Sequence, residues 1–353
     1  MADHPHVLVV GAGIVGAAIA WHLCRGGARV TILEAGAPGG IATAGSLAWI
    51  NASWGHRDDY FRLRFQAMAD WRRLEAMVPA LRVAWTGGLL WDMPADRMAA
   101  FAADHTARAY AVRTVDRAEA ARIEPALAAP PEAAVHAAGE GAVEPLDAAL
   151  ALISAARAHG ATLIADRPAR AIERRAGRVV GVATDAGPLS ADMVVIAAGA
   201  GTAALAGTAG IALPVDDPPA LLLATRPHPP ILRGFVLAPE LHIRQARDGR
   251  LMAGAGFDGG NVADAGARTF ACLRGMLHGG EALQIDWCRL GRRPIPRDGL
   301  PIVGRPAGVD GLYLAVLHSG ITLAPAIGRL AGEEILTGRR DPLLGPFGPD
   351  RFA

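Results

Sequence analysis

Short apolar runs separated by a glycine-rich turn open the chain. His6–Val10 is an apolar, β-branched run that ends at Gly11, and residues 14–24 follow with helical composition. Arg29–Leu33 is a second apolar run, and Glu34 stands at its end. This order predicts strand, turn, helix and strand, which is the start of a nucleotide-binding βαβ unit.

Three glycines in the pattern GxGxxG form that turn. Gly11 permits the tight turn, Gly13 lets backbone approach a pyrophosphate, and Gly16 lets the helix pack closely on the strand. Glu34 is placed to accept hydrogen bonds from ribose hydroxyls, and its charge disfavours NADP. Such a turn also occurs by chance, but the strands, helix and acid in register predict dinucleotide binding. The candidate cofactor-binding residues here are Gly11, Gly13, Ile14, Val15, Gly16, Glu34 and Ala35.

Later segments continue the pattern of alternating strands and helices. They are a helix over 146–159, a strand over 161–165, a hairpin of 169–174 and 179–184 around Gly177, and a buried strand over 192–198 that ends at Gly199. The pattern predicts that a sheet begun at the N-terminus is completed by segments much further along the chain.

Length and charge narrow the class of protein. With 353 residues, 52% hydrophobic and 20% charged, the chain is expected to fold into two globular domains. The formal net charge is +1 and basic residues do not cluster, so no nucleic-acid partner is expected. All 35 basic residues are Arg, which excludes Schiff-base chemistry on lysine.

The three cysteines, Cys24, Cys272 and Cys288, have no CxxC spacing. Neither a disulfide framework nor a metal site is indicated, and a reducing cytoplasm is the expected compartment. We expect no secretion signal, because the first apolar run is already a strand of the fold. Polar residues and Pro325 interrupt the longest apolar stretch, 312–330, so no membrane span is expected.

Several stretches across nearly the whole chain carry a family resemblance. They are VVGAGIVGAAIAWHL with LEAG, GGIATAGSLAW, VEPLDAALAL, DMVVIAAGAGT, GRRPIPRDGLPIVG and HSGITLAPAIGRL. Together they resemble flavoproteins of the D-amino acid oxidase, glycine oxidase and sarcosine oxidase family. The resemblance implies an FAD held by the first fold, with its isoalloxazine reaching toward a second domain.

The implied fold is α/β, with a Rossmann-like FAD-binding domain and a second α+β substrate domain built on an antiparallel sheet. The FAD-binding domain is predicted to be discontinuous, comprising residues 1–80, 141–215 and 290–353. The substrate domain is predicted to comprise 81–140 and 216–289, where the βαβ pattern is missing. Within it, 241–244 and 250–253 are expected to be strands around an Asp-Gly turn, and the Pro-rich stretch 214–230 is interpreted as an inter-domain crossing.

The resemblance assigns further residues to the cofactor. The loop 39–51 is rich in small residues and is expected along the pyrophosphate and flavin, although a flexible surface loop has the same composition. The C-terminal helix predicted over 323–336 is expected to direct its N-terminus at the flavin, where it stabilises developing negative charge. The additional cofactor candidates are Thr43, Ala44, Gly45, Ser46, Ala171, Ile172, Ala198, Gly199, Arg293, Ser319, Gly320, Ile321 and Thr322.

Two side chains are assigned to the substrate. Arg293 matches the family's arginine that grips a substrate carboxylate, a task that suits its planar guanidinium, while Arg292 is expected to point elsewhere. A surface ion pair is the alternative role for either arginine. His242 stands where glycine oxidases carry a tyrosine, and it serves either as a carboxylate ligand or as an ordinary structural histidine.

The rest of the predicted site is sparse. Trp49 is carried over to the flavin edge, and His318 is either a supporting residue or part of a turn. Cys288 is expected to be an ordinary packed thiol, so the FAD is predicted to be noncovalent. Sarcosine oxidases activate oxygen with a lysine, which is absent here, so oxygen and another electron carrier both remain open as acceptors. The stretch 53–60 either lines a substrate entrance or begins a helix.

The predicted reaction is FAD-dependent oxidation of the C–N bond of a small amino acid or N-substituted amino acid, by hydride transfer from the α-carbon to flavin N5, giving an imine. Three alternatives remain: an NAD-dependent dehydrogenase, an FAD-dependent 2-hydroxy acid dehydrogenase, and the flavin subunit of a heteromeric amine dehydrogenase. The expected partner is a small carboxylate-bearing amine, and a homo-oligomer or a heteromeric complex stays open.

Overall fold

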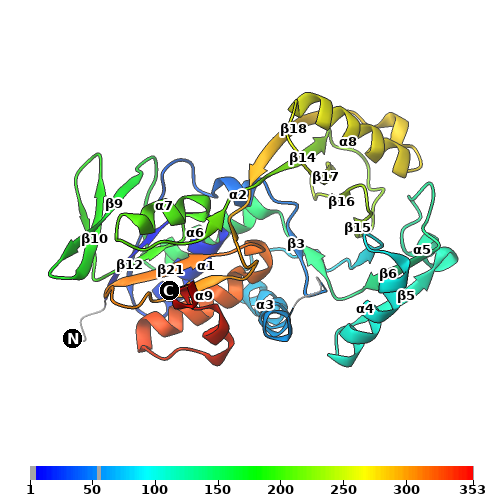
Figure 1. Ribbon diagram of the computed structural model, residues 1–353. Helices are drawn as coiled ribbons and strands as arrows, with labels where there is room; N and C mark the ends of the chain where they lie inside the picture. Colours follow the sequence, from blue (N-terminus) through cyan, green and yellow to red (C-terminus); the bar gives the residue numbers. More distant parts are fainter. Residues whose placement is uncertain (1–4, 54–56, 353) are drawn as a thin grey trace.

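Two large sheets organise the computed structural model, which describes residues 5–53 and 57–352. The first sheet is mainly parallel and the second mainly antiparallel, and they lie in separate layers of the molecule (Figure 1). This arrangement confirms the predicted fold class. Of the stretch 53–60, residues 54–56 lie outside the described part of the chain, and helix α3 (Asp58–Met77) begins just after them.

The first sheet has six strands in the order β20-β21-β12-β1-β2-β8. Their bounds are β1 His6–Val10, β2 Arg29–Leu33, β8 Thr162–Ile164, β12 Met193–Ile196, β20 Ile302–Gly304 and β21 Leu312–Val316. All neighbours are parallel except β20 and β21. Because β1 has β2 on one side and β12 on the other, the carboxyl ends of β1 and β12 form a topological switch point, where α/β sheets bind their ligands.

Helices and a small sheet cover the two faces of the six-stranded sheet. Val7 and Val9 belong to the core under α1 (Ile14–Arg25), α6 (Pro145–Ala158) and α9 (Gly320–Thr337). Leu8 and Val10 face the other core, under β9 (Ala169–Arg175), β10 (Arg178–Thr184), β11 (Leu189–Ser190) and α7 (Thr202–Gly207). Burial on both faces explains why these strands are almost uniformly apolar.

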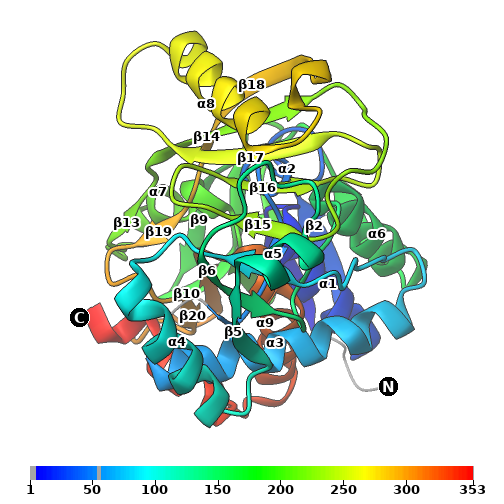
Figure 2. The same cartoon turned by 90° about the vertical axis from the view of Figure 1, so that its right-hand side faces the viewer.

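The second sheet has eight strands in the order β18-β14-β17-β16-β15-β4-β6-β5. Their bounds are β4 Gly88–Leu90, β5 Val112–Asp116, β6 Ala133–Ala137, β14 Pro219–Thr225, β15 Phe235–Leu237, β16 His242–Gln245, β17 Leu251–Gly256 and β18 Ile285–Arg292. Neighbours are antiparallel except β4 and β15. Helix α8 (Val262–Met276) covers the outer face (Figure 2).

Two ribbons join segments of the two layers. β3 (Trp49–Ile50) pairs with β7 (Gly141–Ala142), and β13 (Val215–Asp216) pairs with β19 (Ile295–Pro296). The stretch 214–230, interpreted as an inter-domain crossing, contains β13 and the seven-residue strand β14, and β14 belongs to the second sheet. Pro219 is the first residue of β14, a position at which strands tolerate proline.

The remaining helices lie between these layers or around them. They are α2 (Ile41–Ala44), α4 (Ala95–Ala107), α5 (Arg117–Ile123) and the short 3₁₀ segments Gly199–Gly201, Gly280–Ala282, Pro342–Phe347 and Pro349–Phe352. Among the helices of the described ranges, none combines the length and apolarity that crossing a membrane requires.

The first and last helices cross at very short distance. A Cβ atom on Gly328 of α9 would lie 2.8 Å from the carbonyl carbon of Ala18 in α1, far inside van der Waals contact. A Cβ on Gly16 would likewise lie 2.0 Å from the carbonyl oxygen of Gly11. Glycine at these positions lets α1 pack tightly between β1 and α9.

Gly328→Ala is therefore expected to lower the free energy of unfolding by about 1–3 kcal/mol, the usual effect of overpacking a core. The measurement is equilibrium denaturation by urea, followed by circular dichroism. Gly275→Ala in α8 is the matched control, because nothing lies within 4 Å of a Cβ there. That control should be neutral or gain up to about 1 kcal/mol from helix propensity. Equal stability of the two variants would contradict the tight crossing.

Candidate active site

The glycine turn lies at the switch point, between the end of β1 and the start of α1. Gly11 has a φ of 107°, and a Cβ there would lie 2.4 Å from the carbonyl oxygen of Ala197, which follows β12. Ala198 and Gly199 continue from that point, and Gly199 has a φ of 56° with nothing within 4 Å of a Cβ. The chain thus leaves open space beside the turn, at the carboxyl edge of the sheet.

Glu34 lies beside this turn. Its carboxylate accepts hydrogen bonds from the backbone N–H of Ala12 at 2.7 Å and of Gly36 at 3.1 Å. These contacts hold an anionic side chain, followed by Ala35, next to the N-terminus of α1. Such a carboxylate at the end of the second strand is suited to accept ribose hydroxyls.

The loop 39–51 runs between α1 and the eight-stranded sheet. The Thr43 hydroxyl accepts the N–H of Ile14, at the start of α1, at 3.1 Å. On its other side, the carbonyl oxygen of Ala44 accepts from Arg289 at 2.7 Å and that of Leu47 from Arg244 at 2.6 Å. Gly45 and Ser46 lie between these two anchored carbonyls. The loop is therefore bonded to both layers, unlike a free surface loop.

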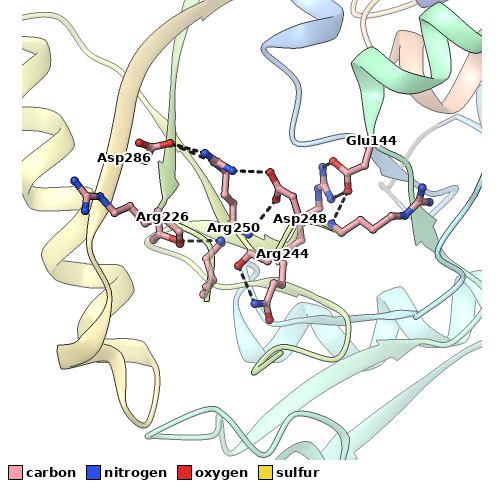
Figure 3. A network of polar contacts seen from close by, with 11 residues as sticks. Glu144, Arg226, Arg244, Asp248, Arg250 and Asp286 are labelled. Atoms are coloured by element: carbon pink, nitrogen blue, oxygen red, sulfur yellow. Dashed lines mark hydrogen bonds and ion pairs between the residues drawn. The ribbon is translucent and has the colours of Figure 1, made fainter. Parts of the chain in front are cut away.

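Arg244 is part of a polar network at the end of β16 and β17 (Figure 3). It is almost fully buried and forms two hydrogen bonds to the carboxylate of Glu144, at 2.9 and 3.2 Å. Glu144 precedes α6 and also accepts the backbone N–H of Arg247. Further out, Arg250 bridges Asp248 and Asp286. This network joins the second sheet to the helix that packs under the first.

The start of α9 meets the start of α1. Ser319 has a φ of 57° and precedes the helix, which begins three residues earlier than predicted, and a Cβ on Gly320 would lie 3.3 Å from Val15. Pro325 lacks the N–H that would bond the carbonyl oxygen of Ile321, and the Trp71 indole N–H bonds that oxygen instead, at 2.9 Å. Two positive helix ends therefore converge on one region.

Thr322 connects α9 to the loop. Its hydroxyl donates to the carbonyl oxygen of Trp49 at 3.0 Å and accepts the N–H of Asn51 at 3.3 Å. The Trp49 ring packs against Phe235 of the second sheet, with 5.8 Å between ring centroids. Trp49 thus lies where the loop, α9 and the eight-stranded sheet meet.

Arg293 and His318 lie close enough to interact electrostatically. The Arg293 guanidinium has no ion-pair partner in the described ranges, and surrounding protein desolvates it enough to lower its pKa. Burial, helped by the positive charges of Arg293 and Arg64, lowers the pKa of His318 to about 4. His318 is therefore neutral near pH 7. Arg292, in contrast, is exposed and bonds Asp217 at 2.6 Å.

His242 is paired with an acid that sequence reasoning missed. Its Nε2 atom lies 3.0 Å from the carboxylate of Asp92, which follows β4. His242 stands opposite Gly254 on β17, and a Cβ on Gly254 would lie 3.6 Å from the Leu47 side chain. The histidine is therefore on the sheet face that meets the loop 39–51.

Some candidates lie elsewhere. Ala171 and Ile172 are on β9, across the six-stranded sheet from α1 and α9, and the N–H of Ile172 donates to the Thr208 hydroxyl at 2.9 Å. Cys288 packs against Gly266 of α8, on the outer face of the second sheet, and burial raises its thiol pKa. The cofactor role of Ala171 and Ile172 stays a prediction, and the packing of Cys288 agrees with the ordinary thiol expected from the sequence.

Sequence reasoning also missed a buried polar group beneath Trp49. Glu140 and Tyr110 contribute a carboxylate and a hydroxyl there, and Arg64 of α3 is buried nearby. A charged residue among apolar neighbours was the available signal, but its partners are distant in sequence.

This arrangement fits FAD. The glycine turn, in which Gly13 leaves room beside Thr43, is suited to a pyrophosphate. The acid at the end of β2 is suited to a ribose, and the two converging helix N-termini are suited to an electron-rich ring system. The noncovalent attachment expected from the sequence stays a prediction.

Comparisons with known proteins agree. The family model described as DAO, FAD dependent oxidoreductase, matches residues 6–334. The chain is 29% identical to a glycine oxidase of Pseudomonas aeruginosa, over 96% of both chains. It is 32% identical to hydrogen cyanide synthase subunit HcnC of the same organism, over 68% of this chain and 60% of the relative. The crystal structure of a glycine oxidase from Geobacillus kaustophilus superposes with a TM-score of 0.88 at 25% identity, covering 98% of both chains. The chain therefore belongs to the DAO family of FAD-dependent oxidoreductases.

Proposed function

We propose that this enzyme oxidises the C–N bond of a small amino acid or N-substituted amino acid to an imine. The observation that carries the proposal is the Arg293 guanidinium near His318, just before α9, for which residues 5–53 and 57–352 provide no ion-pair partner. The relatives named glycine oxidase support the same class of substrate. When bound, FAD would supply the two-electron acceptor for this oxidation.

Arg293 binds and orients the substrate in this proposal. A guanidinium pairs with a carboxylate through two parallel hydrogen bonds, which fixes the carbon attached to that carboxylate. Because His318 is neutral near pH 7, it neither competes for the carboxylate nor repels a substrate cation. Positioning of this kind lowers the activation barrier, because the entropy of orienting the substrate is lost on binding and not in the reacting step.

The other residues contribute to the shape and the electrostatic field of the proposed substrate pocket. The α9 N-terminus directs backbone N–H groups toward charge that develops on the acceptor. The His242–Asp92 pair lies on the sheet face that meets the loop 39–51, and in this proposal the imidazole contacts the substrate carboxylate or its substituent. No general base is assigned, because a substrate amine that is already deprotonated needs none.

A second candidate function is the flavin subunit of a heteromeric dehydrogenase. The relative named hydrogen cyanide synthase subunit HcnC favours it, since that protein is named as part of an assembly. Copurification of a stable partner, together with failure of the isolated chain to be reduced by any amine, supports this alternative. The 2-hydroxy acid alternative is tested by comparing anaerobic flavin bleaching with amino acids and with hydroxy acids. A cytoplasmic location stays a prediction.

Arg293→Ala is expected to keep FAD bound and to raise the substrate dissociation constant by about 100-fold, the effect of losing a charge-assisted pair. The measurement is anaerobic flavin reduction at increasing concentrations of glycine, sarcosine and other small amino acids. Arg292→Ala is the matched control and should behave as the wild type, because Arg292 is exposed and paired with Asp217. Unchanged affinity in Arg293→Ala would refute the carboxylate role.

Glu34→Ala is expected to weaken FAD binding roughly tenfold or more, because it removes a charged hydrogen-bond acceptor for the ribose. Titration of apoprotein with FAD, followed by flavin fluorescence, measures the affinity. Glu132→Ala, at a carboxylate with 82% of its side chain exposed, is the control. An unchanged FAD affinity with unchanged apoprotein stability would assign Glu34 no part in the cofactor site.

A further inference from the structure

A carboxylate with no exposed surface lies directly below Trp49. Glu140 occupies the turn between β6 and β7, and one of its oxygens accepts the Trp49 indole N–H at 2.8 Å. The other oxygen accepts the Tyr110 hydroxyl at 2.6 Å and the backbone N–H of Ser53 at 3.3 Å. Within residues 5–53 and 57–352, no cationic side chain forms an ion pair with Glu140. Neutral donors alone compensate this buried group.

The indole that Glu140 holds belongs to the candidate active site. The Trp49 backbone is fixed by pairing with Ala142 of β7 and by the Thr322 hydroxyl at the start of α9. Its ring packs against Phe235 of the eight-stranded sheet, at an interplanar angle of 32°. The Glu140 hydrogen bond adds a directional restraint at the far edge of the ring, which packing alone does not supply.

Further polar groups tie the same region together. The Tyr110 hydroxyl accepts the N–H of Ala52 at 3.1 Å, so Tyr110 joins Glu140 to the segment that follows Trp49. Behind Tyr110 lie two more buried ionisable groups, Arg64 of α3 and His105 of α4. Arg64 donates to the side-chain oxygen of Asn51 at 2.5 Å. The backbone from Asn51 to Ser53 is therefore held between a buried cation and a buried acid.

We propose that Glu140 is a positioning residue, whose carboxylate holds the Trp49 indole in the orientation that forms one wall of the substrate pocket. This inference rests on the proposed function. The physical basis is that an indole N–H bound to a carboxylate forms a charge-assisted hydrogen bond, stronger and shorter than one to a neutral acceptor. Loss of that charge loosens the indole without removing any apolar packing.

The charge state of Glu140 changes in the physiological range. Burial raises its pKa to about 7, although the hydrogen bonds from Ser53, Tyr110 and Trp49 oppose the rise. As the pH falls through 7, the carboxylate takes up a proton and the indole loses its charged acceptor. The unfolded chain holds this proton less tightly, so Glu140 makes folding less favourable as the pH rises from about 4.5 toward 7.

The test follows the Trp49 indole N–H directly. Holoenzyme labelled with ¹⁵N-tryptophan gives one indole resonance per tryptophan, and Trp49→Phe assigns that of Trp49. In the wild type this resonance is expected to shift with a midpoint near pH 7, and in Glu140→Gln it is expected to be independent of pH. Tyr110→Phe removes a donor that stabilises the charged form, so the midpoint should rise.

Kinetics separate positioning from a structural role. Glu140→Gln is expected to retain FAD and to lower the limiting rate of anaerobic flavin reduction about tenfold, since misorientation affects the reacting step more than binding. The rate of the wild type is expected to depend on pH near 7, and that of Glu140→Gln is expected to lose this dependence. Glu75→Gln is the matched control, because Glu75 is a second carboxylate that accepts an indole N–H, that of Trp85 at 3.4 Å. That variant should leave both the Trp49 resonance and the rate unchanged.

The inference is overturned if the Trp49 resonance titrates equally in wild type and Glu140→Gln, or if the reduction rate does not change. If Glu140→Gln fails to fold, Tyr110→Phe decides, and an unmoved midpoint overturns the inference. If the resonance behaves as expected but no amine reduces the flavin, the indole restraint is supported and the proposed function fails.

Discussion

The close crossing of α1 and α9 is the constraint on which the site depends. Gly328 against Ala18 allows the two helices to approach without side chains between them. Gly320 then lies against Val15, so the N-terminus of the last helix is placed beside the glycine turn that opens the chain. Two helix dipoles consequently act on one small region, although the residues that form it come from opposite ends of the sequence.

Backbone carbonyls, more than side-chain pairs, connect this region to the second sheet. Arg289 and Arg244 both extend from that sheet and donate to carbonyl oxygens of the loop between β2 and β3. A guanidinium suits this role because it presents several donors in a plane and stays charged when buried. Arg244 also bonds Glu144 before α6, so one side chain links the sheet, the loop and a helix.

Two ionisable groups near the candidate site, His318 and Glu140, have opposite electrostatic surroundings. Burial, helped by the positive charges of Arg293 and Arg64, lowers the pKa of His318 to about 4, so it loses its proton well below neutral pH. Glu140 is surrounded by neutral donors and remains close to its protonation midpoint at neutral pH. In the proposed function, the first arrangement leaves the Arg293 cation available to an anionic substrate. The second makes the hydrogen bond to Trp49 responsive to pH.

Local order along the chain was predictable from the sequence. The βαβ start, the helix before residue 160 and the hairpin around Gly177 agree with the structure, because periodicity, glycines and caps act over a few residues. The family resemblance added the FAD and the second sheet, and both are confirmed. The strand β14 was missed because the proline-rich composition around Pro219 is not typical of a strand, whereas its pairing with neighbouring strands depends on tertiary structure.

What only the tertiary structure decided is which polar groups meet. His242 bonds Asp92 across 150 residues, and Trp49 bonds Glu140 across 91. The residues around each acid do not indicate its partner. A hydrogen bond between distant segments depends on how sheets and helices pack, and the periodicity of a single sequence carries no information about that packing. The sequence by itself determined the nucleotide-binding turn and the chemistry available to the chain, and the packing of its two layers decided where those groups stand.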